Sequence, residues 1–263
     1  MTRHWTAAQP DEELGLKAYT NVRLLDPATN LDIICGTAGG LLTDGKQISN
    51  LGPNIFKEGT PKGAEVIDGK GHCLGPGLVD IRVQVREPGY EHKGTIESAG
   101  RAATAGGITT MACLPNTKPI ISDMSQVEFV ARRARKIGLS KIYPYAALTI
   151  DTEGEKLTEI GILSEAGAIA FTDGDRAISN AQVLRRALSY ARTFDLLIVQ
   201  HPEEPSLVPT GGMNAGETAT RLGLPGIPRE AEIIMVERDL RLVEMTGGKI
   251  HFAHISTGES VDV

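Results

Sequence analysis

Residues 76–119 read PGLVDIRVQVREPGYEHKGTIESAGRAATAGGITTMACLPNTKP and form the first strand–helix–strand pattern of the chain. The pattern then repeats along the sequence. Strands are expected near 78–85, 108–114, 141–148, 168–173, 195–201 and 249–255, and helices near 95–105, 124–137, 155–166, 180–193 and 228–246. Strands that alternate with helices at this spacing indicate a parallel sheet with crossover helices. Six such strands with polar motifs at their carboxyl ends predict an α/β protein with a (β/α)8 TIM-type barrel.

The chain before this pattern has a different rhythm. Residues 1–16 contain Gln, Pro, Asp and Glu and are expected to form a flexible arm. Residues 17–75 alternate short apolar stretches with Gly, Asn and Pro, and Asp44-Gly45 is a hairpin signal. We therefore predict a small, β-rich, sandwich-like domain at 17–75, followed by the barrel at 76–263.

Local signals mark the ends of several helices. Ser122 or Asp123 can cap the helix expected at 124–137, and Gly138 and Gly167 follow two of the helices. The sequence Ser-Thr-Gly-Glu at 256–259 is a capping-box pattern, which predicts that another helix begins there.

The barrel pattern stops two units short of eight. A six-stranded, unclosed barrel would leave unpaired strand edges and uncovered apolar surface, which is unfavourable. We therefore expect the sequence to be part of a longer protein, with the C-terminal part of the barrel missing. The alternative is a naturally shortened subunit that a partner completes.

Composition excludes several classes of function. The 263 residues carry a net charge of -6, which argues against a broad nucleic-acid interface, since that needs clustered Lys and Arg. No apolar run approaches the roughly 20 residues that cross a bilayer, and the N-terminus has no secretory h-region. Cys35, Cys73 and Cys113 are widely spaced, which favours reduced thiols in a cytoplasmic protein.

The strand at 79–86 carries the strongest functional signal. Side chains alternate between the faces of a strand, so Arg82, Gln84 and Arg86 share one face. In a barrel, polar side chains at this end of a strand point into the mouth where chemistry occurs. Two histidines at the spacing of Arg82 and Gln84 would suit zinc, whereas a guanidinium offers no lone pair. Neither residue here is such a ligand, and we expect this face of the strand to border a site; the alternative is that Arg82 is a surface residue.

The motifs PGLVD, REPG, GGITT and PNT within 76–119 resemble those of dihydroorotases, cyclic amidohydrolases of the amidohydrolase superfamily. Further matches are AFTDGD at 170–175, QHPEEP at 200–205, MNAGETATRLGLPGIPREAE at 213–232 and HFAHIST at 251–257. The resemblance covers the chain from about residue 17 and implies a barrel preceded by a small β-rich domain. It also implies ancestry in pyrimidine synthesis, in the reversible cyclisation of carbamoyl aspartate.

The resemblance assigns metal-binding roles to single positions. Two histidine ligands of the family fall on Arg82 and Gln84, and the metal-bridging aspartate falls on Gly174. Asp173 and Asp175 flank Gly174, so a shifted ligand stays open.

Two further histidine ligands of the family match His201 and His254, and the last metal-binding aspartate would lie beyond Val263. Two imidazoles alone make a poor zinc site, because catalytic zinc needs about three protein ligands plus water. We therefore expect no cofactor and no hydrolysis, although active relatives use zinc.

The substrate side is better preserved, since Arg86 and Asn116 match residues that hold the substrate carboxylate in the family. Either the pocket still binds a carboxylated ligand, or Arg86 and Arg82 form salt bridges with Asp173 or Asp175 in place of the metal. We favour the salt bridges.

These observations lead to three hypotheses. The first is a catalytically inactive dihydroorotase-like protein that serves as a structural subunit of aspartate carbamoyltransferase, as the resemblance implies for relatives without metal ligands. The second is an active metal-dependent dihydroorotase with an unusual site. The third is a sensor for carboxylate ligands that uses Arg86 and Asn116. Hydantoinase and allantoinase rank lower, because 168–173 has no lysine to carboxylate. A homo-oligomer is compatible with each hypothesis.

Overall fold

The computed structural model describes residues 15–208 and 210–263. The chain divides into two compact units, one up to Leu78 and the other from Val79 to Val263. Most of the arm expected at 1–16 lies outside the described residues, but Leu16 already belongs to the first strand. Each unit has a hydrophobic core of its own.

The N-terminal unit consists of short strands, as its frequent turn residues predict. One sheet has the order β5-β4-β1-β6 and a second has the order β3-β2-β7. The hairpin expected at Asp44-Gly45 joins β4 to β5, with Asp44 opposite Gln47. The strands are β1 Leu16–Thr20, β2 Arg23–Asp26, β3 Leu31–Ile34, β4 Gly40–Asp44, β5 Gln47–Gly52, β6 Glu65–Asp68 and β7 Cys73–Leu74.

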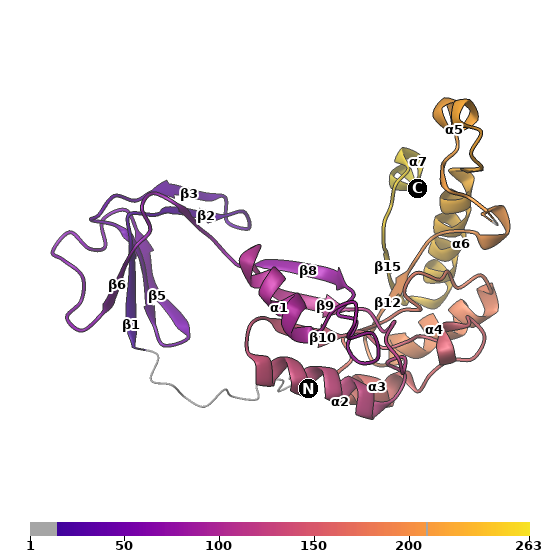
Figure 1. The fold of residues 1–263 in the computed structure, drawn as a ribbon, viewed down its shortest axis with the longest axis horizontal. Helices are drawn as coiled ribbons and strands as arrows, with labels where there is room; N and C mark the ends of the chain where they lie inside the picture. Colours follow the sequence, from indigo (N-terminus) through magenta and orange to yellow (C-terminus); the bar gives the residue numbers. More distant parts are fainter. Residues whose placement is uncertain (1–14, 209) are drawn as a thin grey trace. The chain divides into compact units, whose positions relative to one another are not determined.

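The second unit is built on the six strands that the sequence predicts (Figure 1). They are β8 Leu78–Val83, β9 Ile108–Cys113, β10 Lys141–Pro144, β11 Ala170–Phe171, β12 Leu197–Gln200 and β15 Lys249–Phe252. Hydrogen bonds order them as β10-β9-β8 and β11-β12-β15, and a parallel bridge between Ala146 and Phe171 joins the two groups. The ladders β9–β10, β11–β12 and β12–β15 are parallel, which agrees with crossover connections.

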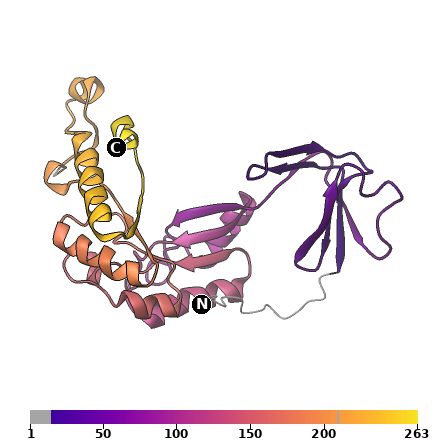
Figure 2. The same cartoon turned by 180° about the vertical axis from the view of Figure 1, so that it is seen from behind.

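The five expected helices connect these strands, and Figure 2 shows the unit from behind. They are α1 Ile96–Ala105, α2 Met124–Ile137, α3 Ile160–Ala166, α4 Ala181–Thr193 and α6 Glu230–Thr246. Asp123 caps α2 by accepting from the amides of Ser125 and Gln126. Gly138 and Gly167 end α2 and α3 in the left-handed conformation, as expected of a C-terminal glycine.

Alternation along the strands separates two apolar layers. The larger cluster lies between helices and sheet and includes the fully buried Phe171, Leu188 and Ile198. A smaller cluster comes from the other strand face and consists of Ala112, Leu114, Tyr145, Ala170, Val199 and Ala253. Because neighbouring residues of a strand face opposite ways, this smaller cluster lines the inside of the barrel wall.

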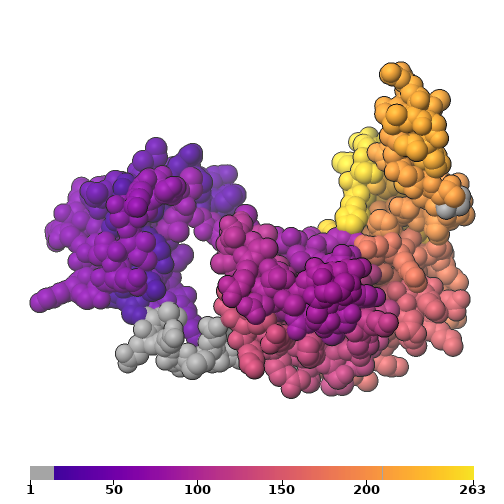
Figure 3. Space-filling model, in the orientation of Figure 1, coloured from indigo at the N-terminus to yellow at the C-terminus, as the bar shows by residue number. Residues whose placement is uncertain are grey.

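Several short elements were not predicted. Residues 201–229 leave the barrel wall between β12 and α6 and contain η2 Pro205–Leu207, β13 Met213–Asn214, α5 Glu217–Leu222 and β14 Gly226–Ile227. This segment, in orange, stands out from the body of the unit in Figure 3. The turn η1 Ile150–Thr152 follows β10. The helix predicted at 256–259 is present as α7 Gly258–Asp262, capped by Thr257 instead of Ser256.

Two sequence-based predictions concern membrane spans and cysteines. Within residues 15–208 and 210–263, no helix is long and apolar enough to cross a membrane. All three cysteines are free; Cys35 and Cys113 are buried and Cys73 is exposed.

Candidate functional site

The predicted site residues follow the carboxyl ends of neighbouring strands, where barrels place their chemistry. Arg82 lies in β8 and Gln84 directly after it, whereas Asn116 follows β9 and Asp173, Gly174 and Asp175 follow β11. His201 comes directly after β12, and His254 comes two residues after β15.

The two residues at the replaced ligand positions both bind Asp175. Arg82 Nη2 donates to Asp175 Oδ1 at 2.7 Å and Gln84 Nε2 donates to Asp175 Oδ2 at 3.0 Å. Arg82 Nη2 also donates to the carbonyl of Gly174 at 3.3 Å. The Arg82 side chain is only 15% exposed, so it is no surface residue. The salt bridge expected in place of the metal is therefore present between Arg82 and Asp175.

Asp173 has a different role. It is 1% exposed and accepts hydrogen bonds from the amides of Leu148 and Thr149, at 3.0 and 2.8 Å, and from the Thr149 hydroxyl. Burial raises the pKa of the Asp173 carboxyl, and these donors oppose that rise. The carboxylate is thus used to fix the segment after β10 to the segment after β11.

Gly174 packs against Asn116 so closely that no side chain fits between them. Its φ is +71°, a left-handed conformation that favours glycine. A Cβ built on Gly174 would lie 2.6 Å from Asn116 Cγ. The Asn116 Oδ1 atom is buried and has no hydrogen-bond partner. A side chain at Gly174, where the resemblance predicts the family's bridging aspartate, would therefore meet the Asn116 amide.

His201 and His254 lie together, as their shared role in the family implies. Their ring centroids are 5.5 Å apart in an edge-on arrangement. His201 Nε2 is 3.4 Å from Glu203 Oε2, while its Nδ1 is buried without a partner. Burial, followed by the charges of Arg82 and His201, lowers the pKa of His254.

Arg86 lies apart from this ion pair. Among the described residues, no salt bridge connects Arg86 with Asp173 or Asp175, so this half of the expected charge replacement is wrong. Arg86 has a φ of +68°, and its carbonyl accepts from the amide of Tyr90 at 2.9 Å. The substrate-binding roles of Arg86 and Asn116 stay predictions.

A cavity of about 590 Å³ lies beside the two histidines. It is lined by His201, Pro202, Glu203, Asn214, Ala215, Ile227, Pro228, Arg229, Glu230, Ala231, Glu232, His254, Ser256, Thr257 and Glu259. Much of this lining comes from the segment 213–232, whose family motif was recognised; the helix from 228 was predicted, but the short elements before it were not.

Glu232, which sequence analysis did not single out, fixes the loop that carries His254. Its carboxylate accepts from the amides and hydroxyls of Ser256 and Thr257 at 2.7–2.9 Å. Burial alone would raise its pKa, but hydrogen bonds from Thr257, Ser256 and Ser260 lower the pKa of Glu232 to about 2. Only its place in the family motif could have drawn attention to it.

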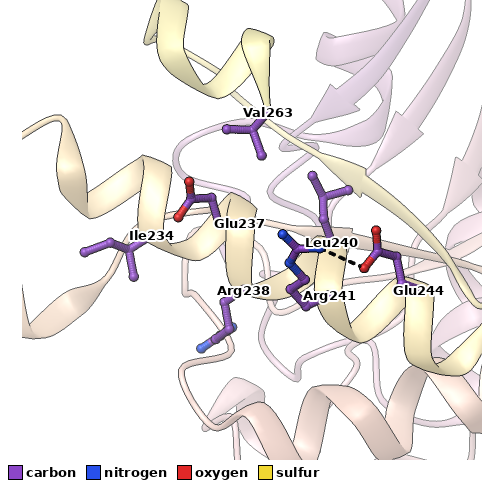
Figure 4. A pocket seen from close by; sticks show the side chains of 7 residues that line it. All are labelled: Ile234, Glu237, Arg238, Leu240, Arg241, Glu244 and Val263. Atoms are coloured by element: carbon purple, nitrogen blue, oxygen red, sulfur yellow. Dashed lines mark hydrogen bonds and ion pairs between the residues drawn. The ribbon is translucent and has the colours of Figure 1, made fainter.

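A second hollow of about 480 Å³ runs along α6 below Val263 and contains none of the predicted site residues (Figure 4). Its lining is Ile234, Glu237, Arg238, Leu240, Arg241, Glu244 and Val263. Arg241 and Glu244 pair across one helical turn at 3.2 Å. The hollow is therefore a surface feature of α6 and not part of the site.

The residues at the family's metal position do not fit zinc. A protonated guanidinium and an amide stand where two imidazoles would bind, and Asp175 is held by both. Asp173 is directed to the backbone of Leu148 and Thr149. Within the described part of the chain, no group of three His, Cys, Asp or Glu side chains is arranged to hold a metal ion.

The family described as dihydro-orotase-like matches residues 71–260. The chain belongs to this family. Dihydroorotase of Pelobacter propionicus is 44% identical over 243 residues, which cover 92% of this chain and 56% of that protein. Dihydroorotase of Syntrophotalea carbinolica is 43% identical over 244 residues, with 93% and 56% covered. The chain thus spans about half the length of the curated relatives it matches.

Solved structures of cyclic amidohydrolases share the fold. L-hydantoinase from Arthrobacter aurescens superposes with a TM-score of 0.72 at 19% identity, over 93% of this chain and 54% of that structure. Dihydroorotase from Saccharomyces cerevisiae, in complex with 5-fluoroorotic acid, gives a TM-score of 0.51 at 15% identity, over 71% and 50%. The predicted barrel architecture is confirmed by these likenesses.

Proposed function

We propose that this chain comes from a dihydroorotase homologue that does not catalyse metal-dependent hydrolysis and acts by association in the cytoplasm. The observation that carries the proposal is the ion pair of Arg82 with Asp175, completed by Gln84. The Arg82 guanidinium places a fixed positive charge at one of the two ligand positions, and the neutral Gln84 amide stands at the other. The same charge neutralises the carboxylate of Asp175.

Hydrolysis of a ring amide needs an activated water and a group that polarises the carbonyl. In metal-dependent hydrolases the ion supplies both, since it lowers the pKa of bound water and acts as a Lewis acid. The described residues offer no equivalent pair. Asp173 is enclosed by backbone donors, and His201 and His254 belong to no group of three described side chains that is arranged to hold a metal ion.

Aspartate carbamoyltransferase is the partner we propose. The choice follows from the resemblance, because relatives without metal ligands serve as structural subunits of that enzyme. The preserved fold supports a role that depends on shape and surface. On α6, the apolar side chain of Met245 is 67% exposed.

The test uses the full-length protein, co-expressed with aspartate carbamoyltransferase of the same organism. We expect the two proteins to elute as one complex in size-exclusion chromatography. After incubation with zinc and desalting, the chain should retain less than ~0.1 zinc ion, because the site lacks three protein ligands. Hydrolysis of dihydroorotate should stay at background level. Separate elution would refute the association, whereas zinc binding with turnover would refute the loss of catalysis.

An active enzyme with an unusual metal site is the second candidate. The contact between His201 and His254 favours it, because the resemblance assigns both imidazoles to one metal site and they lie side by side here. The same experiment separates it from the first candidate. Variants of Asp175 would then decide whether that carboxylate leaves Arg82 to bind the ion.

A further inference from the structure

The outer face of α2 is basic, although the chain as a whole is acidic, with 33 Asp and Glu against 27 Lys and Arg. Helix α2 lies on the outside of its unit (Figure 1) and buries Val127 and Val130. Phe129, Arg132 and Lys136 are exposed on the opposite face, which we call the basic face. Among the described residues, no carboxylate pairs with Arg132 or Lys136. Aromatic rings and arginines are enriched at protein interfaces, so this face has the composition of a docking surface.

An acidic turn follows the strand on which α2 packs. Helix α2 lies against β10, and the chain continues from β10 into the turn at 149–158. The side chains of Asp151, Glu153 and Glu155 are exposed and have no ion-pair partner within residues 15–208 and 210–263. Ile150, beside them, is also exposed. The acidic turn therefore carries the complement of the basic face, an apolar side chain with unpaired carboxylates around it.

Hydrogen bonds hold the acidic turn in one shape. Asp173 accepts from the amide of Thr149 at 2.8 Å, and the Thr149 hydroxyl accepts from the amide of Gly154 at 2.8 Å. The amide of Ile150 donates to the carbonyl of Lys156 at 2.8 Å. The carboxylates and the apolar side chain are thus presented in fixed positions. A surface that is already ordered loses less conformational entropy when it binds.

We propose that two copies of this chain associate, with the basic face of one copy on the acidic turn of the other. Both surfaces belong to the unit from residue 79 to residue 263, so a two-fold axis forms the same contact twice. Arg132 and Lys136 then meet carboxylates of the second copy, and Phe129 packs on its Ile150. Nucleic acid fits this surface less well, because the nearby carboxylates repel phosphates. The contact is made without carbamoyltransferase, so the inference goes beyond the proposed function.

The test is analytical ultracentrifugation of the full-length protein alone, at several protein concentrations. We expect a dimer whose dissociation constant rises at least about tenfold between ~0.1 and ~1 M salt, because the Debye length falls from about 10 to about 3 Å. Arg132→Glu with Lys136→Glu should weaken the dimer by at least about tenfold at low salt. Glu153→Lys with Glu155→Lys should do the same, since like charges then face each other.

A matched control reverses two arginines on another helix. Arg185→Glu with Arg186→Glu changes the net charge as much as the reversal on α2 does, at exposed positions of α4. This pair should leave the dissociation constant within about threefold of the wild-type value. A loss of association caused by net charge alone would appear in both reversals, whereas the proposed contact is affected only by the reversal on α2.

Mixing the two double variants with reversed interface charges gives the decisive readout. The first has carboxylates on both surfaces and the second has cations on both, so each should be monomeric alone. Mixed together, they should form a heterodimer, because every contact then joins opposite charges. If one of them does not fold, the dissociation constant of the other decides against the control. The proposal is overturned if the wild type stays monomeric up to about 0.1 mM, if the control pair weakens the dimer equally, or if the mixture stays monomeric.

Discussion

Replacement of Gly174 by alanine should destabilise the barrel unit by ~3 kcal/mol, and the structure divides this figure into two parts. The first is backbone strain, because a Cβ at a φ of +71° costs ~1 kcal/mol. The second is overpacking, because the Cβ would lie 2.6 Å from Asn116 Cγ. Overpacked sites typically cost about 1–3 kcal/mol, and ~2 kcal/mol is expected here.

A double-mutant cycle measured by urea unfolding isolates the second part. In an Asn116→Ala background the amide is absent, so Gly174→Ala should cost only ~1 kcal/mol. Gly107→Ala is the matched control, because Gly107 has a φ of +78° and a Cβ added there would meet no atom of a more distant residue within 4 Å. It should also cost ~1 kcal/mol.

Equal costs for Gly174→Ala and Gly107→Ala would refute the close packing against Asn116. A cost that persists unchanged in the Asn116→Ala background would do the same. The expected result has a functional consequence. An aspartate is larger than alanine, so restoring the family's bridging carboxylate at Gly174 would require Asn116 to move as well. Reversion of Arg82 and Gln84 to histidine alone should therefore not rebuild a zinc site.

Three further substitutions separate buried, hydrogen-bonded carboxylates from exposed ones. Glu232→Gln should cost ~2 kcal/mol at pH 7, somewhat less than the roughly 3 kcal/mol implied by a pKa lowered from 4.5 to about 2, because the amide keeps some hydrogen bonds. A lowered folded-state pKa stabilises fully above about pH 4.5 and less as the pH falls toward 2, so less than half of the cost should remain at pH 3. Urea unfolding at both pH values measures this, with the exposed Glu244→Gln on the same helix as control; equal costs at pH 7 and pH 3 would contradict it. Asp173→Asn should cost ~1–3 kcal/mol, because Thr149 and the neighbouring amides lose a charged acceptor. Asp175→Asn should cost less than ~1 kcal/mol, because the Asp175 side chain is 58% exposed and the asparagine can still accept from Arg82. A larger cost for Asp175→Asn than for Asp173→Asn in thermal unfolding would contradict this order.

The order and type of the barrel elements could be predicted because their signals are local. The helix expected at 124–137 has these bounds in the structure, with Asp123 as its cap and Gly138 at its end. Other elements are shorter than predicted. The strand expected at 168–173 is reduced to Ala170–Phe171, and the helix expected at 155–166 begins at Ile160. Strand β11 ends early because Asp173, just after it, uses its carboxylate to bind the backbone that follows β10.

The short elements between β12 and α6 could not be predicted in the same way. Strands of two residues, such as β13 and β14, have no measurable periodicity. They pair in parallel across the intervening helix α5, with Met213 opposite Gly226. Their contribution to the cavity beside His201 and His254 therefore became visible only in three dimensions.

The sequence by itself determined the fold class and the family, and it predicts that Arg82 and Gln84 replace two metal ligands. Strand and helix periods, caps and motifs extend over few residues, so they can be read along the chain. Only the tertiary structure decided which carboxylate compensates Arg82. Asp173 and Asp175 are two positions apart and equivalent in the sequence, yet the amides of Leu148 and Thr149 bind the first and Arg82 binds the second. Ninety-three positions separate Arg82 from Asp175, and such a contact is set by where strand ends meet in space.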